Sequence, residues 1–207
     1  MLGLFLDIFI ILFVVVDPIG LAPIFAAITQ GGTREYRRRM AVRGTVIAGV
    51  ILFVFALVGA ELLRALGIGM PAFQIAGGIL LFLVAIDMVF ARHSGIRSTT
   101  EREQREAELK ADVSVFPLAF PLIAGPGALT TVLLMAGRYA EAPRLVLLVL
   151  AVVVIVLLLV LAALLQAERI MRWIGETGTN VITRVFGVVL AALAVQYVLD
   201  GLRAGFA

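Results

Sequence analysis

The chain has 207 residues, of which 62% are apolar and 15% are charged, with a formal net charge of +3. Soluble domains carry about 25% charged residues, so this composition excludes a soluble globular protein. The absence of cysteine excludes disulfides and thiolate metal sites. The net charge of +3 does not by itself indicate a nucleic-acid partner. We expect none, because the positions of the arginines along the chain are more informative than their number. We also expect no cofactor and no metal, since His93 is the single histidine.

Hydropathy predicts six spans, because about 20 apolar residues in a helix cross the hydrocarbon. The clearest is 145–165, which holds 21 consecutive apolar residues. The N-terminal stretch lacks a basic flank and a cleavage site, so we interpret it as a retained first span. The sequence predicts an all-α membrane protein with a single transmembrane domain over 1–207 in the lipid bilayer. In chain order the spans are 4–29, 44–63, 71–91, 114–137, 145–166 and 181–202.

Lysine and arginine predict the orientation. Thirteen of the 17 lie on the side that spans 1, 3 and 5 reach, and Arg64, Arg138, Arg144 and Arg203 lie on the other. By the positive-inside rule the side with thirteen is cytoplasmic. Loops 30–43, 92–113 and 167–180 are then cytoplasmic and both termini are periplasmic. The thirteen are Arg34, Arg37, Arg38, Arg39, Arg43, Arg92, Arg97, Arg102, Arg105, Lys110, Arg169, Arg172 and Arg184.

The chain resembles itself at an offset of 108 or 109 residues. We interpret 1–91 as a first three-helix repeat, 92–113 as a cytoplasmic linker and 114–207 as a second repeat. Three spans are an odd number, so the second repeat enters the membrane from the opposite side, as in many secondary transporters. The paired features are Asp17–Gly20 with Gly125–Ala128, Arg64–Gly67 with Arg172–Gly175, Gly78 with Gly187, and 85–88 with 194–197.

The first and fourth spans are predicted to be broken near their centres. Proline stops or kinks a helix but is well placed at its first position. Asp17 before Pro18 is typical of an N-cap, and Gly125 before Pro126 repeats the arrangement without the side chain. A broken backbone at membrane depth is tolerated only inside protein or beside a polar cavity. The opened helix starts would attract an anion such as a carboxylate.

Asp17 is the leading candidate for a functional charge. A carboxylate at a helix centre costs about 2.5–3.5 kcal/mol on the insertion scale. The side chain could pair with a substrate ammonium or carry a coupling proton; the alternative is a cap that only stabilises the kink. Thr130 and Thr131 follow the second break by one turn and could contact a ligand, or bond their own backbone.

Three further polar residues lie towards the ends of predicted spans. Gln74, Asp87 and Gln196 could gate a pathway, and Asp87 and Gln196 occupy equivalent places in the two repeats. The alternative is a hydrogen bond between helices.

Three segments, "DPIGLAPIF", "FPLAFPLIAGPGALTTVLLM" and "AALAVQYVLDG", resemble the MarC family of bacterial integral membrane proteins. The resemblance covers essentially the whole chain. It implies a six-span inner-membrane protein grouped with LysE-type amino-acid exporters, some members of which transport neutral amino acids such as glycine and alanine. The residues that match the family's motifs are Asp17, Pro18, Gly20, Gly125, Pro126, Gly127 and Thr130.

These patterns favour a secondary transporter of a small zwitterionic substrate, coupled to a proton or to sodium. A cation channel or metal-ion permease is the first alternative, although divalent ions usually require several oxygen ligands. A membrane scaffold without transport is the second, and a homo-oligomer fits each. We expect no enzyme, because no Ser–His pair, paired aspartates or H-E-x-x-H motif lies at membrane depth.

Overall fold

The structure is a computed structural model that describes residues 2–90 and 112–206, and every regular element within them is helical. Five spans are long and apolar enough to cross a membrane, one of them the joined α1 and α2, and the bent pair η1 and α6 makes a sixth candidate. The predicted all-helical membrane fold is confirmed. The elements are α1 (Leu2–Val16), α2 (Pro18–Ile28), α3 (Arg34–Ala65), α4 (Met70–Phe90), η1 (Ser114–Ile123), α6 (Pro126–Arg138), α7 (Pro143–Leu165), α8 (Ala167–Trp173) and α9 (Gly175–Phe206).

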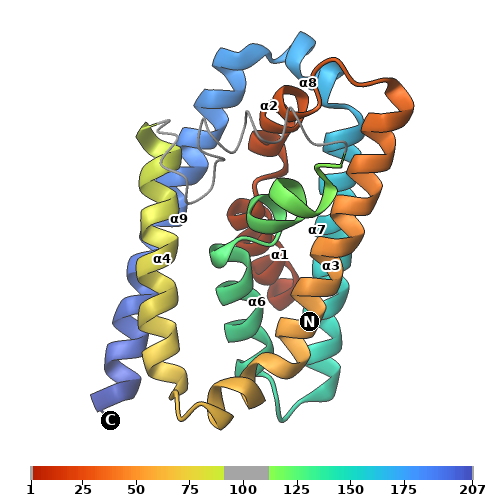
Figure 1. Ribbon diagram of the computed structural model, residues 1–207. Helices are drawn as coiled ribbons and strands as arrows, with labels where there is room; N and C mark the ends of the chain where they lie inside the picture. Colours follow the sequence, from red (N-terminus) through yellow and green to blue (C-terminus); the bar gives the residue numbers. More distant parts are fainter. Residues whose placement is uncertain (1, 91–111, 207) are drawn as a thin grey trace.

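The two interrupted spans occupy the centre of the bundle. Figure 1 shows α1, α2, η1 and α6 between the pair α3 and α7 on one side and the pair α4 and α9 on the other. Successive spans run in opposite directions, and both chain ends lie in the lower part of that view. The segments that the sequence marks as unusual are therefore surrounded by regular helices.

Two segments predicted as loops are helical instead. The predicted loop 30–43 contains the first turns of α3, which begins at Arg34 after Thr33 caps the N–H of Tyr36 at 3.2 Å. The predicted loop 167–180 contains α8 and the start of α9. Arginine and glutamate are good helix formers, so these helices continue beyond their apolar parts. The predicted connector 92–113 lies outside the described residues except at its last two positions.

Glycines let α4 and α9 pack with their backbones close together. A Cβ on Gly78 would lie 2.8 Å from the carbonyl oxygen of Ala194 and from the Val198 side chain, both on α9. A Cβ on Gly187 of α9 would lie 3.0 Å from the amide nitrogen of Val89 on α4. Small residues at such contacts are typical of helix pairs in membranes, where close van der Waals packing drives association.

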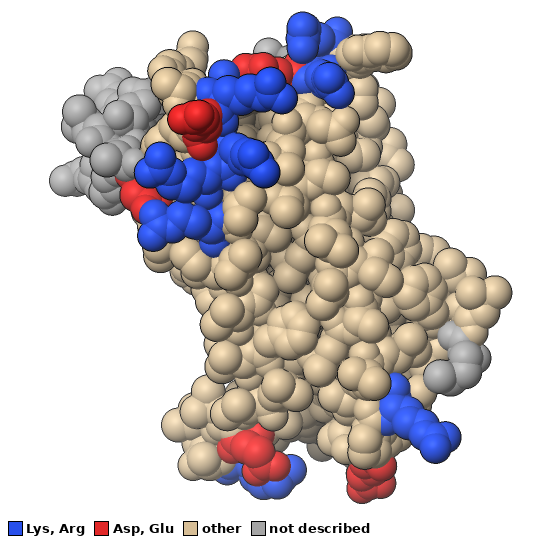
Figure 2. All heavy atoms as spheres, turned by 90° about the vertical axis from the view of Figure 1, so that its right-hand side faces the viewer, with Lys and Arg blue, Asp and Glu red and all other residues tan. Residues whose placement is uncertain are grey.

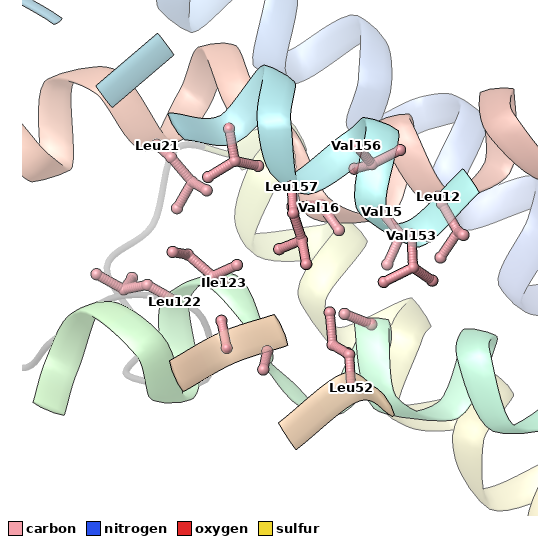
Figure 3. Packing of buried hydrophobic residues seen from close by; sticks show 14 of the residues in the cluster. Leu12, Val15, Val16, Leu21, Leu52, Leu122, Ile123, Val153, Val156 and Leu157 are labelled. Carbon is pink, nitrogen blue, oxygen red and sulfur yellow. The ribbon is translucent and has the colours of Figure 1, made fainter. Parts of the chain in front are cut away.

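The buried core surrounds the first break. Leu12, Val15 and Val16 of α1 pack against Val153 and Leu157 of α7, with residues of α2, α3 and η1 completing the cluster (Figure 3). Because lipid tails are as apolar as these side chains, burial in the protein gains little from the hydrophobic effect. Shape complementarity is therefore the main stabilising contribution here.

Charge is distributed unequally between the two ends of the molecule. Figure 2 shows most of the visible Lys and Arg at the upper end, above a wide apolar belt. Large apolar side chains are exposed along this belt, including Val46, Val50 and Leu158, each at 59%. The belt matches a lipid-facing surface, and the basic end matches the side predicted to be cytoplasmic.

Candidate functional site

Asp17 forms the first break. The residue has φ 49° and ψ 69°, in the left-handed region, and separates α1 from α2. Its Oδ1 accepts the Gly20 N–H at 3.1 Å, and its Oδ2 accepts the Thr183 hydroxyl of α9 at 3.2 Å. Pro18 occupies the first helical position, so its missing N–H leaves no donor to satisfy. The predicted N-cap is confirmed, and Asp17 is 1% exposed.

Gly20 leaves the space that the Asp17 carboxylate occupies. A Cβ at this position would collide with the carboxylate and lie 2.7 Å from the Thr183 hydroxyl oxygen. No larger residue can stand here without moving one of the two polar groups. The motif Asp17-Pro18-x-Gly20 is therefore one structural unit, in which aspartate caps, proline starts the helix and glycine makes room.

The second break is sharper. The axes of η1 and α6 differ by 59°, and Phe116 and Phe120 inside η1 have extended backbone conformations. Gly125 is the N-cap of α6, and no side chain of the described residues bonds there. The N-termini of the two inner helices thus differ, since the Asp17 side chain caps the first, whereas no side chain of the described residues caps the second. This difference follows from the sequence, in which Gly125 occupies the place of Asp17.

The second break packs directly against the first span. A Cβ on Gly127 would lie 2.8 Å from the Leu81 side chain and 3.5 Å from the Val15 side chain. A cavity of about 20 Å³ remains between Val15, Val84 and the turn from Pro121 to Ala128. A cavity of this size holds about one water molecule. The structure therefore represents a state in which this place is closed to a larger ligand.

One polar side chain near the break has no hydrogen bond. The hydroxyls of Thr45 and Thr131 are the buried polar side-chain groups of the described residues that lack a hydrogen bond. Thr131 is 0% exposed, and Tyr197 of α9 is its polar neighbour. Thr130 is buried as well, with its side chain against Gly77. An unsatisfied buried hydroxyl costs about 1–3 kcal/mol, which makes Thr131 a candidate ligand contact.

A cavity with both polar and apolar walls, called the vestibule below, lies near the less basic end. It has a volume of about 920 Å³ and lies between α1, α4, α6 and α9. Tyr197 lines its wall and thereby connects it with Thr131. Carboxylates, a guanidinium and neutral polar groups face one space, which is a suitable combination for a zwitterion. Its polar residues are Asp7, Gln74, Arg138, Tyr139, Tyr197 and Asp200.

The predicted gating residues lie in different places. Gln74 is half-buried and lines the vestibule. Gln196 is exposed and donates to Asp200 at 2.7 Å, so its amide touches the vestibule only through that carboxylate. Asp87 is buried at 9% exposure near the end of α4, apart from the residues above. The structure therefore places Val15 against the second break and Thr130 against Gly77, and it places Gln74 at the vestibule. Neither Asp87 nor Gln196 lines either cavity.

Sequence reasoning missed several residues of this region. Thr183 is 166 positions from Asp17, and a threonine within an apolar helix gives no local signal. Asp7, Tyr197 and Asp200 are separated by most of the chain but line one cavity. Asp7 and Asp200 are acidic residues within the first and last predicted spans, and this unusual placement could have marked them as candidate site residues.

A profile for MarC family integral membrane proteins matches residues 2–206. The chain belongs to the MarC family. Within this family it is 35% identical over 202 residues to a UPF0056 membrane protein of Archaeoglobus fulgidus, covering 97% of this chain and 93% of the relative. It is 33% identical to the UPF0056 membrane protein YvbG of Bacillus subtilis, covering 100% and 97%.

A third MarC relative carries a location in its name. The UPF0056 inner membrane protein YhgN of Escherichia coli is 33% identical, covering 94% of this chain and 93% of the relative. No solved structure matches the chain. The resemblance in sequence motifs is thus confirmed at the level of the family, and the chain is an integral multi-pass membrane protein.

Proposed function

We propose that this protein is a secondary transporter of small zwitterions, most simply neutral amino acids such as glycine and alanine. The observation that carries the proposal is the meeting of two interrupted spans inside the bundle, one with a buried carboxylate and the other without a side-chain cap. The N–H groups at the start of α6, at Gly127 and Ala128, bind the substrate carboxylate. Asp17 binds the ammonium group or carries the coupling proton or sodium ion.

The hydrogen bonds of Asp17 link substrate binding to the position of α9. Both carboxylate oxygens already accept hydrogen bonds, one from Gly20 within α2 and one from Thr183 on α9. An ammonium group can replace the hydroxyl of Thr183 without disturbing the cap, because the two donors use different oxygens. Substrate binding therefore competes with the contact between α2 and α9, and this competition couples binding to movement of α9.

The small cavity at the second break supports an occluded state. About 20 Å³ cannot hold an amino acid, whereas the vestibule of about 920 Å³ can. Substrate enters from the vestibule, where Asp7 and Arg138 offer opposite charges, and passes the hydroxyls of Tyr197 and Thr131. Opening of the break follows, with Gln74 beside the entrance.

A pair of backbone angles and a pair of contacts support an inverted repeat as the basis of alternating access. Gly67 and Gly175, which are 108 positions apart, have φ values of 70° and 72°. Gly78 of α4 packs on Val198 of α9, and Gly187 of α9 packs on Val89 of α4. The two contacts are equivalent, because Gly187 lies 109 positions after Gly78 and Val89 lies 109 positions before Val198. Reciprocal contacts of this kind are expected when two halves are related by an approximate two-fold axis.

The repeat also relates longer elements. α3 corresponds to α7 and α8 together, because Arg34 and Ala65 fall on Pro143 and Trp173 at offsets of 109 and 108. Exchange of the two halves' conformations then opens the site to the opposite side, as in other transporters built from inverted repeats.

We also propose a bacterial inner-membrane location with both termini periplasmic. The basic end supports this orientation, and the Escherichia coli relative is called an inner membrane protein. The chain has no cysteine, so single-cysteine variants give unambiguous labelling. In intact cells an impermeant maleimide is expected to label Glu141→Cys and to leave Glu35→Cys unlabelled; the opposite pattern reverses the orientation.

The transport proposal is tested by counterflow of labelled glycine and alanine in proteoliposomes, with and without proton or sodium gradients. Wild type is expected to show saturable counterflow that Asp17→Asn reduces strongly. The matched control is Glu61→Gln, which removes an exposed carboxylate paired with Arg64 at 2.9 Å. A channel would conduct ions without counterflow and a scaffold would move nothing. Either result across a broad amino-acid panel refutes the proposal.

A further inference from the structure

The basic end of the molecule contains a second large cavity. It has a volume of about 750 Å³ and lies where α2 ends and α3 begins, against the end of α7 and the start of α8. Five arginines and two glutamates line it, which leaves an excess of three positive charges. The arginines are Arg34, Arg37, Arg38, Arg169 and Arg172.

Among the described residues, ion pairs and hydrogen bonds neutralise only part of this positive charge. Arg37 forms an ion pair with Glu168, with Nη1 and Oε1 2.5 Å apart. Arg172 donates from Nε to the backbone carbonyl of Glu168 at 3.3 Å. Within residues 2–90 and 112–206, Arg34 and Arg169 form no ion pair. Long basic side chains around one cavity thus retain donors for an anion.

The floor of the same cavity is apolar. Phe25 and Leu164 are each 2% exposed and form its inner wall together with Ala26, whereas Leu165 at the end of α7 is 49% exposed. The cavity therefore changes from charged to apolar within its own depth, at the level where an apolar span ends. A headgroup bound to the arginines leaves its acyl chains next to the apolar belt in Figure 2.

We propose that this cavity binds the phosphate headgroup of an anionic phospholipid from the leaflet on the basic side. Arg34, Arg38 and Arg169 hold the phosphodiester oxygens, since guanidinium groups form paired hydrogen bonds with phosphate. Phe25, Leu164 and Leu165 contact the glycerol backbone and the first carbons of the acyl chains. Basic pockets between membrane helices are suited to such headgroups. A soluble phosphate would use the arginines but not the apolar floor.

The test measures lipid binding to the delipidated full-length protein in neutral detergent by native mass spectrometry. Phosphatidylglycerol and cardiolipin are compared with phosphatidylcholine, and inorganic phosphate and glycerol 3-phosphate form a separate arm. The double variant Arg34→Gln, Arg169→Gln is compared with Arg64→Gln, Arg144→Gln, which removes the same charge from exposed positions at the other end. Thermal unfolding without lipid verifies that both variants are folded.

The anionic lipids are expected to bind wild type more tightly than phosphatidylcholine does. The cavity variant is expected to bind them about 25-fold more weakly, at about fivefold for each arginine, and the control variant is expected to match wild type. Equal binding of phosphatidylcholine, or equal losses in both variants, overturns the proposal. Competition by inorganic phosphate or glycerol 3-phosphate at similar affinity assigns the cavity to a soluble anion instead. No transport is measured, so the result is independent of the proposed function.

Discussion

Gly20→Ala tests whether the Asp17 carboxylate and the start of α2 form one unit. The new Cβ would collide with the carboxylate and stand 2.7 Å from the Thr183 hydroxyl oxygen, so both hydrogen bonds to Asp17 must change. Loss of an N-cap bond costs about 0.5–2 kcal/mol, and loss of the hydroxyl bond costs about 0.5–1.5 kcal/mol. Alanine in place of helical glycine returns about 0.5–1 kcal/mol.

The matched control is Gly3→Ala, because a Cβ at Gly3 of α1 has no atom within 4 Å. Relative to this control, Gly20→Ala is expected to lower the free energy of unfolding by about 1–3 kcal/mol. Reversible unfolding in mixed micelles, titrated with a denaturing detergent, measures the difference. If the two variants are equally stable, the carboxylate does not sit where the structure places it, and the competition between substrate and Thr183 loses its basis.

Three further predictions concern other parts of the molecule. Gly78→Ala and Gly187→Ala each bring a Cβ within 3.1 Å of a backbone nitrogen on the facing helix, that of Val198 and that of Val89. Each should lower the free energy of unfolding by about 1–3 kcal/mol in the same titration; a large difference between them argues against reciprocal packing. Thr131→Val removes a buried hydroxyl without a partner, so unfolding should show equal or higher stability while glycine counterflow falls; unchanged counterflow excludes Thr131 from the site. Hydrogen bonds from the Ser114 hydroxyl and N–H, with Arg43 nearby, lower the pKa of Asp112 from 3.8. The stabilisation that ionised Asp112 gives the folded state is therefore present above pH 3.8 and is lost as the pH falls through the lowered pKa. Asp112→Asn should weaken this acid dependence of thermal unfolding. An unchanged dependence of the unfolding temperature on pH contradicts the role given to Asp112.

The breaks were predictable because their causes are local. Asp17-Pro18 contains its own cap and its own helix start, and Gly125-Pro126 contains the same start without the cap. Neither prediction requires knowledge of the rest of the fold. The number and order of the spans were predictable for a similar reason, since the thickness of the hydrocarbon fixes the length of each apolar segment.

The partners of these breaks were not predictable, because they are tertiary. Thr183 is one of several polar residues near the start of α9, and only packing selects it as the partner of Asp17. The start of α3 was misjudged because hydropathy marks the apolar part of a helix and not its cap, here Thr33. Gln196 was favoured by its equivalence to Asp87, but the side of α9 on which it lies is exposed.

The vestibule and the basic cavity are related in a way that connects both proposals. Leu134, Met135 and Arg138 of α6 line the vestibule, and the residues 109 positions earlier, Phe25, Ala26 and Thr29, line the basic cavity. If the two halves exchange conformations as we propose, a cavity equivalent to the vestibule forms at the basic end. It is lined by the same end of α2 that lines the basic cavity. A lipid headgroup held there would occupy part of that space, so its binding would favour the state in which the vestibule stays open. Because linkage is reciprocal, substrate that stabilises the opposite state would in turn weaken the binding of the lipid.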